Sequence, residues 1–405
     1  VNMSLQNPEG DEPRKYVLMD FEEARKWTVT GGIGAEIAKI GGCATCLDAP
    51  AGDTGFSPRV SFGLTRRNFL GTGHIISFQS RASTLQKRGV LSYNAPQFRG
   101  DPDINLLFSG VYDDSRDVRT YSARRREASV QVGQRWSRAS TMLYRITYRR
   151  VSISDLKISD PVLIPQFLQP VRLGIVAGTY IQDRRDDPTD SHRGVYNTLD
   201  VGWATRLLAS QADFTRVLGH NATYHPMGLG SRYVLARSLT FGFLKRLGET
   251  HEIPLPERFF GGGPTSHRGF PSNQAGPRDL QTGFPLGGNT VLVNQFEMRY
   301  PLIGENIRGT LFLDSGNVYS DLKKLSLRVT QKGLDDFNYM VHAVGFGLRY
   351  RTPVGPIRID LAYSINPPRF FGCHGTREQL LTGCPEKRQQ QISHFQFHFS
   401  LGQAF

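Results

Sequence analysis

The sequence lacks any long apolar segment. Its 405 residues contain no uninterrupted apolar run near the roughly 18 residues that a membrane-crossing helix needs, so a helical membrane protein is excluded. A transmembrane β-barrel is not excluded, because its strands alternate lipid-facing apolar residues with lumen-facing polar residues and so dilute the average hydropathy. The 43 glycines, 15 tyrosines and 25 phenylalanines fit such a barrel.

Cysteine is scarce, and the histidines show no organised pattern. The four cysteines are Cys43, Cys46, Cys373 and Cys384, and a zinc site would need thiolates brought together from both ends of the chain. Disulfides suit an exported protein better, so we expect disulfide pairs and no metal. The ten histidines are scattered without a Ser/His/acid or metal-ligand spacing, so we expect no catalytic site, no enzymatic activity and no cofactor.

The positive charges are not distributed as in a nucleic-acid-binding protein. The formal net charge is +13, but the arginines recur within alternating segments such as residues 141–150 instead of forming a compact cluster. This distribution predicts a basic barrel lumen, basic loops against anionic lipid headgroups, or both. We expect no nucleic-acid partner.

A repeated unit accounts for most of the chain. From Trp27 to the end, alternating runs of about ten residues, the length of a tilted membrane-spanning strand, are separated by turns or loops. This pattern predicts an all-β fold, a 16-stranded antiparallel transmembrane β-barrel, and fits a soluble antiparallel sandwich less well. The predicted strands are residues 27–39, 57–67, 72–85, 89–95, 104–113, 120–135, 141–152, 171–183, 195–208, 213–224, 232–247, 290–301, 307–316, 341–352, 356–366 and 392–405.

The connections between the predicted strands alternate in length. Short connections follow even-numbered strands, whereas odd-numbered strands are followed by the longest ones, as bacterial outer-membrane barrels have short periplasmic turns and long external loops. The longest connections are residues 40–56, 248–289, 317–340 and 367–391.

The start of the chain has a different pattern. No signal peptide is visible, and Val1, Met3 and Leu5 alternate as a strand before a polar turn. We therefore expect a fragment of a longer precursor, in which residues 1–26 end a preceding periplasmic domain with its linker and residues 27–405 form the barrel.

Two strands place carboxylates where a glycine-rich loop could reach them. The loop, residues 257–270, carries Arg268, and alternation predicts that Glu297 and Asp314 face the lumen. A guanidinium would find planar acceptors there for bidentate pairing. Because ordering each loop residue costs roughly 1 to 2 kcal/mol, we expect these partners to fix Arg268.

Several motifs together resemble one protein family. His-Arg-Gly-Phe at residues 267–270, preceded by Arg-Phe-Phe-Gly-Gly at 258–262, resembles the Val/Ile-Arg-Gly-Phe/Tyr motif of the sixth external loop in the BamA/TamA superfamily of outer-membrane assembly barrels. Phe-Leu-Asp-Ser-Gly-Asn at 312–317 is similar to that family's Phe-x-Asp-x-Gly motif. His267 departs from the family's usual Val or Ile, and Gln403 interrupts the usual apolar C-terminal pattern.

The resemblance implies a loop that is fixed inside the barrel. In this family, the arginine of the sixth external loop docks against lumen carboxylates and holds that loop folded into the lumen. The glycine after it permits a tight tip, and the aromatic residue packs. The residues of this implied loop lock are Arg268, Gly269, Phe270, Glu297, Asp314 and Gly316.

The resemblance also implies a weak seam between the first and last strands. Such a seam opens sideways, and its exposed edge templates the strands of an incoming client. Glycines weaken strand interiors and allow kinks, although they also permit close packing at barrel corners. The implied seam residues are Gly31, Gly32, Gly34, Gly402 and Phe405.

The family implies a function and a location. The expected protein folds and inserts β-barrel proteins in the outer membrane of a diderm bacterium, with residues 1–26 ending a POTRA-like domain. Its expected partners are unfolded outer-membrane protein clients, outer-membrane lipid or lipopolysaccharide, and periplasmic accessory proteins. The alternatives are a polypeptide pore of the two-partner-secretion type and a passive barrel that anchors an upstream enzyme domain.

The cysteines fall in the first and last predicted external loops, which a closed barrel brings side by side. Local pairs would brace each loop, whereas cross-pairs would staple the seam from outside. Local pairing is favoured for Cys373 with Cys384, but a local bridge between Cys43 and Cys46 would be strained.

Overall fold

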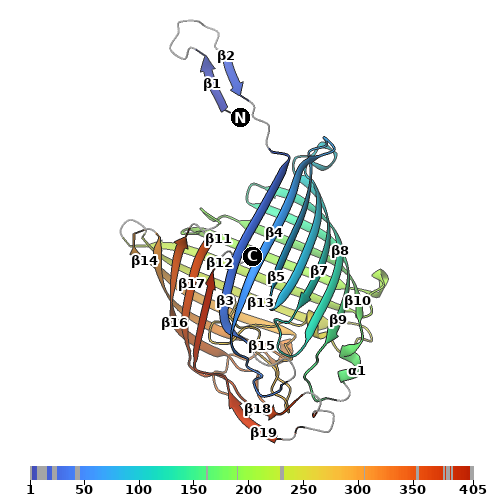
Figure 1. The fold of residues 1–405 in the computed structure, drawn as a ribbon, viewed down its shortest axis with the longest axis vertical. Coiled ribbons are helices and arrows are strands. Elements are labelled where there is room, and N and C mark those ends of the chain that lie inside the picture. The colour runs from blue at the N-terminus through green and yellow to red at the C-terminus, as the bar shows by residue number, and fades with distance from the viewer. Residues whose placement is uncertain are drawn as a thin grey trace.

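The structure is a computed structural model. Its N-terminal strands β1 (Asn2–Gln6) and β2 (Tyr16–Asp20) form a separate two-stranded sheet, which lies beyond one end of the barrel in Figure 1. Assignment of residues 1–26 to a POTRA-like domain stays a prediction. The structure describes residues 2–6, 16–20, 25–41, 46–160, 163–188, 190–228, 232–304, 306–352, 355–376, 379, 384 and 386–401.

Sixteen antiparallel strands close into one barrel, which confirms the predicted fold class. Each predicted run corresponds to one barrel strand, because apolar and polar residues alternate along all of them. The barrel strands are β3 (Trp27–Gly41), β4 (Asp53–Phe69), β5 (His74–Ser83), β6 (Gln86–Ala95), β7 (Ile104–Ser115), β8 (Ser122–Ser137), β9 (Ser140–Ser154), β10 (Val171–Asp183), β11 (Gly194–Ala204), β12 (Phe214–Met227), β13 (Tyr233–Arg246), β14 (Thr290–Ile303), β15 (Ile307–Tyr319), β16 (Val341–Thr352), β17 (Gly355–Ser364) and β20 (Phe395–Leu401).

Some boundaries differ from the sequence prediction. The run at residues 195–208 ends at residue 204, because the Thr205 side chain accepts a hydrogen bond from the Leu207 N–H and starts a short 3-10 turn. The last predicted loop contains a hairpin of β18 (Arg369–His374) and β19 (Glu386–Gln391). In the described ranges, no helix is long and apolar enough to cross a membrane.

Alternation separates an apolar outer face from a more polar inner face. Phe108, Val130, Ile146 and Val176 are successive cross-strand neighbours on β7 to β10, and all four are exposed. Inside the barrel, polar side chains such as Asp314 and Asp360 are fully buried. An exposed apolar band around a polar interior is the arrangement that a bilayer covers.

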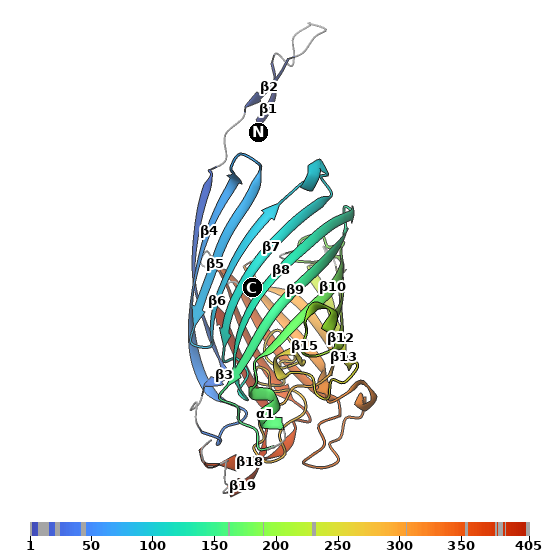
Figure 2. The same ribbon diagram turned by 90° about the vertical axis from the view of Figure 1, so that its right-hand side faces the viewer.

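The two ends of the barrel differ. The end nearest β1 and β2 has short turns, such as residues 138–139, whereas the other end gathers the long connections with α1 (Leu163–Leu168), β18 and β19 (Figures 1 and 2). The longest connection in sequence, residues 247–289, joins β13 to β14. This segment, called loop 6 below, carries Arg268 and brings it against the strand faces of β14 to β17.

The described part of β20 has fewer paired positions with β3 than with β17. Among the described residues, the closure between β20 and β3 consists of three paired positions, Phe399–Ile37, Ser400–Glu36 and Leu401–Ala35. With β17, β20 has seven paired positions over Phe395–Leu401. The predicted seam residues Gly402 and Phe405 lie outside the described residues.

Candidate functional site

Arg268 is fully buried and reaches both of the carboxylates that the sequence nominated. Its Nε and Nη2 donate to Asp314 Oδ2 and Oδ1 on β15 at 2.8 and 2.6 Å, a bidentate geometry, and its backbone N–H donates to Oδ2 at 2.9 Å. Its Nη1 donates to Glu297 Oε1 on β14 at 2.7 Å. Burial disfavours the charged guanidinium, but the hydrogen bonds and charge of Asp314 outweigh burial and raise the Arg268 pKa, so the group stays charged.

A third carboxylate extends the site to β17. Asp360 is fully buried, and its Oδ1 lies 3.9 Å from Arg268 Nη1. It accepts hydrogen bonds from Arg349 Nη2 at 2.7 Å and from Arg358 Nε at 2.9 Å. Asp360 therefore shares its charge among three guanidinium groups.

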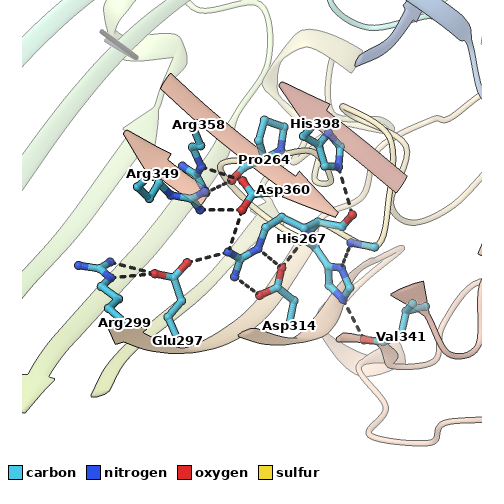
Figure 3. A network of polar contacts seen from close by, with 12 residues as sticks. Pro264, His267, Glu297, Arg299, Asp314, Val341, Arg349, Arg358, Asp360 and His398 are labelled. Atoms are coloured by element: carbon cyan, nitrogen blue, oxygen red, sulfur yellow. Dashed lines mark hydrogen bonds and ion pairs between the residues drawn. The ribbon is translucent and has the colours of Figure 1, made fainter. Parts of the chain in front are cut away.

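Guanidinium and carboxylate groups alternate through the whole site, as Figure 3 shows. Glu297, which accepts from Arg268, also accepts from Arg299 Nε at 3.0 Å. Because every buried carboxylate has a cation beside it, the charges offset much of the cost of their own desolvation. We call these residues the Arg268 cluster: Arg268, Glu297, Arg299, Asp314, Arg349, Arg358 and Asp360.

Two histidines hold the backbone around the arginine. His267 Nδ1 accepts from the Gly269 N–H at 3.2 Å, and its Nε2 lies 3.0 Å from the Val341 carbonyl oxygen on β16. These partners require a neutral ring with the proton on Nε2, and burial lowers the pKa of His267 accordingly. On β20, His398 Nε2 donates to the Arg268 carbonyl oxygen at 3.1 Å.

Small and aromatic residues allow loop 6 and the barrel strands to pack closely. A Cβ at Gly269 would lie 2.6 Å from a side-chain carbon of β16, and one at Gly316 would lie 2.2 Å from a backbone oxygen of β14. The Phe312 ring lies 3.5 Å from the centre of the Arg268 guanidinium, and Phe270 is fully buried in the largest apolar cluster. The structure thus brings together all six residues of the predicted loop lock.

Loop 6 has a second charged attachment, which the sequence analysis missed. Both carboxylate oxygens of Glu257 lie 2.9 Å from Arg149 Nη1 on β9, and Arg149 Nε donates to Glu127 on β8 at 2.7 Å. Glu257 is 5% exposed. Its place beside the loop motif was the available signal. Alternation puts Arg149 on the same face of β9 as Arg145, and nothing in the sequence pattern distinguishes these two arginines.

Asp360 and His398 were also missed as members of the site. Both lie on the polar faces of their strands in the sequence pattern, but Asp360 comes 92 positions after Arg268 and His398 comes 130 positions after it. Only closure of the barrel places β17 and β20 beside this loop. No spacing rule connects residues that far apart.

The seam glycines occupy different surroundings. A Cβ at Gly34 would lie 2.8 Å from the Leu401 carbonyl oxygen, so this glycine lets β3 and β20 approach closely. A Cβ at Gly32 would instead meet Ser61 of β4 at 2.7 Å, and one at Gly31 would meet nothing within 4 Å. Of the three, Gly34 is the one with a described neighbour across the seam.

The first and last external loops meet over the seam. The Leu47 N–H donates to the Gly375 carbonyl oxygen at 2.9 Å, and the Gly375 N–H donates to Asp48 Oδ1 at 3.0 Å. The His374 ring pairs with the same Asp48 carboxylate. These contacts join loops that flank β3 and β20.

The covalent bond in the last loop is local. Cys373 and Cys384 form a disulfide across the β18–β19 hairpin. Cys46 is also disulfide-bonded, and Cys43 lies outside the described residues. Among the described residues, no three His, Cys, Asp or Glu side chains are grouped to hold a metal ion.

Comparison with known families identifies the barrel. Residues 68–405 match the model of the Omp85 superfamily domain. The chain belongs to the Omp85 superfamily. This Omp85 chain is 26% identical over 366 residues to the outer membrane protein assembly factor BamA of Neisseria meningitidis serogroup B. That alignment covers 79% of this chain and 44% of the relative, so the chain spans less than half of that protein's length.

Solved structures show the same fold. The crystal structure of BamA from Haemophilus ducreyi lacking POTRA domains 1-3 matches with a TM-score of 0.71 at 17% identity, over 98% of this chain and 74% of that one. CdiB from Acinetobacter baumannii matches with a TM-score of 0.54 at 12% identity, over 99% and 65%. Family and fold together make this Omp85 chain an integral β-barrel of the outer membrane of diderm bacteria.

Proposed function

We propose that this Omp85 barrel folds and inserts β-barrel proteins into the outer membrane by opening between β3 and β20. The uneven pairing of β20 carries the proposal: all seven of its described residues pair with β17, but three of them pair with β3. Every backbone group in lipid must be paired, so a parted seam offers edges that an incoming strand can satisfy. Strand addition uses main-chain hydrogen bonds and requires no fixed client sequence.

The first strand has the features of a template. Trp27, Val29 and Ile33 of β3 are exposed, so this strand presents apolar side chains on its outer face. Unfolded outer-membrane proteins are the proposed clients. Periplasmic accessory proteins are proposed to deliver them to this edge.

Loop 6 is proposed to brace one side of the seam from within the lumen. The Arg268 side chain of loop 6 is hydrogen-bonded to carboxylates of β14 and β15 and lies beside a carboxylate of β17. His398 of β20 donates to the Arg268 carbonyl oxygen. Among the described residues, no member of the cluster forms a hydrogen bond or an ion pair with β3. In this proposal β20 is held by the loop, and β3 is the strand that moves.

Cysteines across the seam test the proposal. Glu36 and Ser400 are directly paired, so oxidation of the Glu36→Cys/Ser400→Cys variant should abolish assembly of a client barrel in proteoliposomes, and reduction should restore it. The matched control is Ser77→Cys/Ser92→Cys, which joins β5 to β6 at side chains 2.6 Å apart and should leave assembly unchanged. Equal assembly by the two oxidised variants contradicts lateral opening.

The fold likeness to CdiB favours a second candidate, a pore that secretes a polypeptide through its lumen. The same variants separate the two candidates. A barrel with a sealed seam would still pass a polypeptide through its lumen, whereas it would no longer release a folded client sideways. A passive anchor would show no transport or assembly with either pair of cysteines, oxidised or reduced.

A further inference from the structure

Three arginines stand side by side on the outer face of the barrel. Arg126 of β8 is paired directly with Arg150 of β9, and Arg150 is paired with Arg172 of β10. All three are exposed, and none forms an ion pair in the ranges that the structure describes. Like charges directly opposite each other destabilise a sheet. Binding of an external anion would therefore offset the repulsion among Arg126, Arg150 and Arg172, which we call the arginine row.

The acidic groups nearby are already engaged. Asp114 on β7 lies two paired positions nearer the long loops than Arg126, and its carboxylate is 3.6 Å from Arg124. Glu127 faces the other side of β8 and is bonded to Arg149. The protein itself thus leaves the arginine row positively charged.

The arginine row lies at the external border of the apolar band. The exposed Trp136 near the short turn comes ten positions after Arg126 on β8. At about 3.3 Å per residue and a strand tilt of about 40°, these ten steps rise about 25 Å along the barrel axis, which is the height of the apolar band of such barrels. The outward side chains between them are Ala128, Val130, Val132 and Gln134.

The outer face is hollow next to the arginine row. A Cβ at Gly110 of β7 would meet no atom within 4 Å. The hollow has a volume of about 540 Å³, with Phe78, Leu91 and Tyr148 among its walls and Arg126 at its rim. A second hollow of about 470 Å³ shares Gly110 and Leu91 and continues along the strands toward the short-turn end.

We propose that the arginine row and these hollows bind a phosphorylated, multiply acylated lipid of the outer leaflet, the lipid A part of lipopolysaccharide. Its phosphates accept charge-assisted hydrogen bonds from Arg126, Arg150 and Arg172, since the guanidinium fork suits phosphate oxygens. An acyl chain fills the hollow beside Gly110. A glycerophospholipid with one phosphate would leave part of the row unpaired, so the charge of the row favours a lipid with two phosphates.

The site is distinct from the proposed seam. In the barrel order, β4 to β7 separate β8 from β3, so bound lipid would fix a wall that does not part. Loss of this site is therefore measured by lipid A binding, whereas loss of lateral opening is measured by assembly of a client barrel.

Lipid titration of charge variants tests the arginine row. Bisphosphorylated lipid A is titrated into the complete protein in nanodiscs, and bound lipid is counted by native mass spectrometry. We expect Arg126→Gln/Arg150→Gln/Arg172→Gln to bind lipid A at least about tenfold more weakly, because three charge-assisted contacts are lost. Equal binding by this variant and the unchanged protein would overturn the proposal.

The matched control removes three positive charges from the short-turn end. In Arg66→Gln/Arg99→Gln/Arg138→Gln the change in net charge is the same, but the arginine row is intact, so lipid A binding should stay unchanged. A loss as large as that of the row variant would mean that overall charge alone attracts the lipid, which overturns the site.

A variant of the hollow keeps the test decisive if the charge variant fails to fold. Gly110→Leu has open space around the new side chain and should fold, fill the hollow and weaken lipid A binding while every arginine remains.

Two further probes identify the occupant with the unchanged protein. Inorganic phosphate should not displace lipid A, and phosphatidylglycerol should bind more weakly. Displacement by phosphate, equal binding of phosphatidylglycerol, or full binding by Gly110→Leu contradicts a lipid A site.

Discussion

Arg268 is bonded at every polar group it has. Its guanidinium and its backbone N–H donate to carboxylates of two strands, and its carbonyl oxygen accepts from His398 on a third. Each nitrogen of this buried guanidinium is hydrogen-bonded, so the loss of any partner leaves an uncompensated group away from water. At the residue scale, this dependence predicts large effects from single substitutions.

Removing Asp314 should release the tip of loop 6. We expect Asp314→Ala to favour opening of the loop by about 3 to 5 kcal/mol, because Arg268 would remain buried without its main partner. Hydrogen exchange of residues 257–289 measures this opening. The control is Asp103→Ala, which breaks an exposed pair with Arg135 and should change protection by at most about 1 kcal/mol. Equal protection in both variants would refute the lock.

The neutral His267 ring should make loop 6 sensitive to acid. Burial lowers its pKa although Asp314 opposes the shift, so the open loop binds a proton more readily than the closed one. The contribution to stability is therefore complete above about pH 6.5 and is lost as pH falls through the lower pKa of the closed form, with a slope of at most about 1.4 kcal/mol per pH unit.

The pH dependence of hydrogen exchange in loop 6 checks this expectation. Protection should fall below about pH 6.5 in the unchanged protein and should fall less steeply in His267→Val. His225→Val, at an exposed histidine of β12, serves as the control and should keep the original slope. A slope that is the same in all three proteins would exclude His267 as the titrating group.

At the scale of elements, the β18–β19 hairpin covers the external side of loop 6. The Phe370 ring lies 4.3 Å from the Arg278 guanidinium centre, and Cys373 belongs to a buried cluster with Leu47 and Phe284. Burial lowers the pKa of Arg278 to about 9. Among the described residues, its Nη atoms donate to uncharged oxygens, those of Gly283 and Gln274. The hairpin therefore protects a part of the loop that carries a costly buried charge.

Opening the disulfide should loosen this cover and leave the barrel intact. The bridge spans 11 positions, for which chain entropy predicts a contribution of about 3 kcal/mol to hairpin stability. We expect Cys373→Ala/Cys384→Ala to raise proteolytic cleavage within residues 369–391 and to leave the heat-modifiable mobility of the barrel unchanged. Loss of that mobility shift would show that the bridge supports the barrel as a whole.

At the scale of the whole molecule, loop 6 connects two regions of the wall. Glu257 binds Arg149 on β9, and eleven residues later Arg268 binds β14 and β15. Because both attachments belong to one short segment of loop 6, either one limits how far the other can move from the barrel wall. The two sites should therefore be coupled although they share no direct contact.

A double-mutant cycle measures this coupling. We expect Arg149→Gln and Arg268→Gln each to lower the protection of loop 6 partly, and the double variant to lower it by more than the sum, with a coupling of about 0.5 to 3 kcal/mol. The comparison pair is Arg135→Gln with Arg268→Gln, since Arg135 bonds to Asp103 and not to loop 6, and its effects should add. Additivity in both pairs would mean that the two attachments act independently.

The sequence by itself determined the strands, their number and the lumen faces of Glu297 and Asp314. These properties follow from a period of two that every strand repeats and that a bilayer outside and water inside enforce. The importance of Arg268 could also be predicted from the sequence, because the residues next to it form the motif.

Only the tertiary structure decided the rest of the site. Asp360, His398 and Arg149 join loop 6 because the barrel closes with a particular register, and partners set by closure leave no mark on local spacing. The arginine row has the same origin, since Arg126, Arg150 and Arg172 become neighbours through cross-strand pairing. Local alternation determines which way a side chain faces, but the register of the closed sheet determines what it meets.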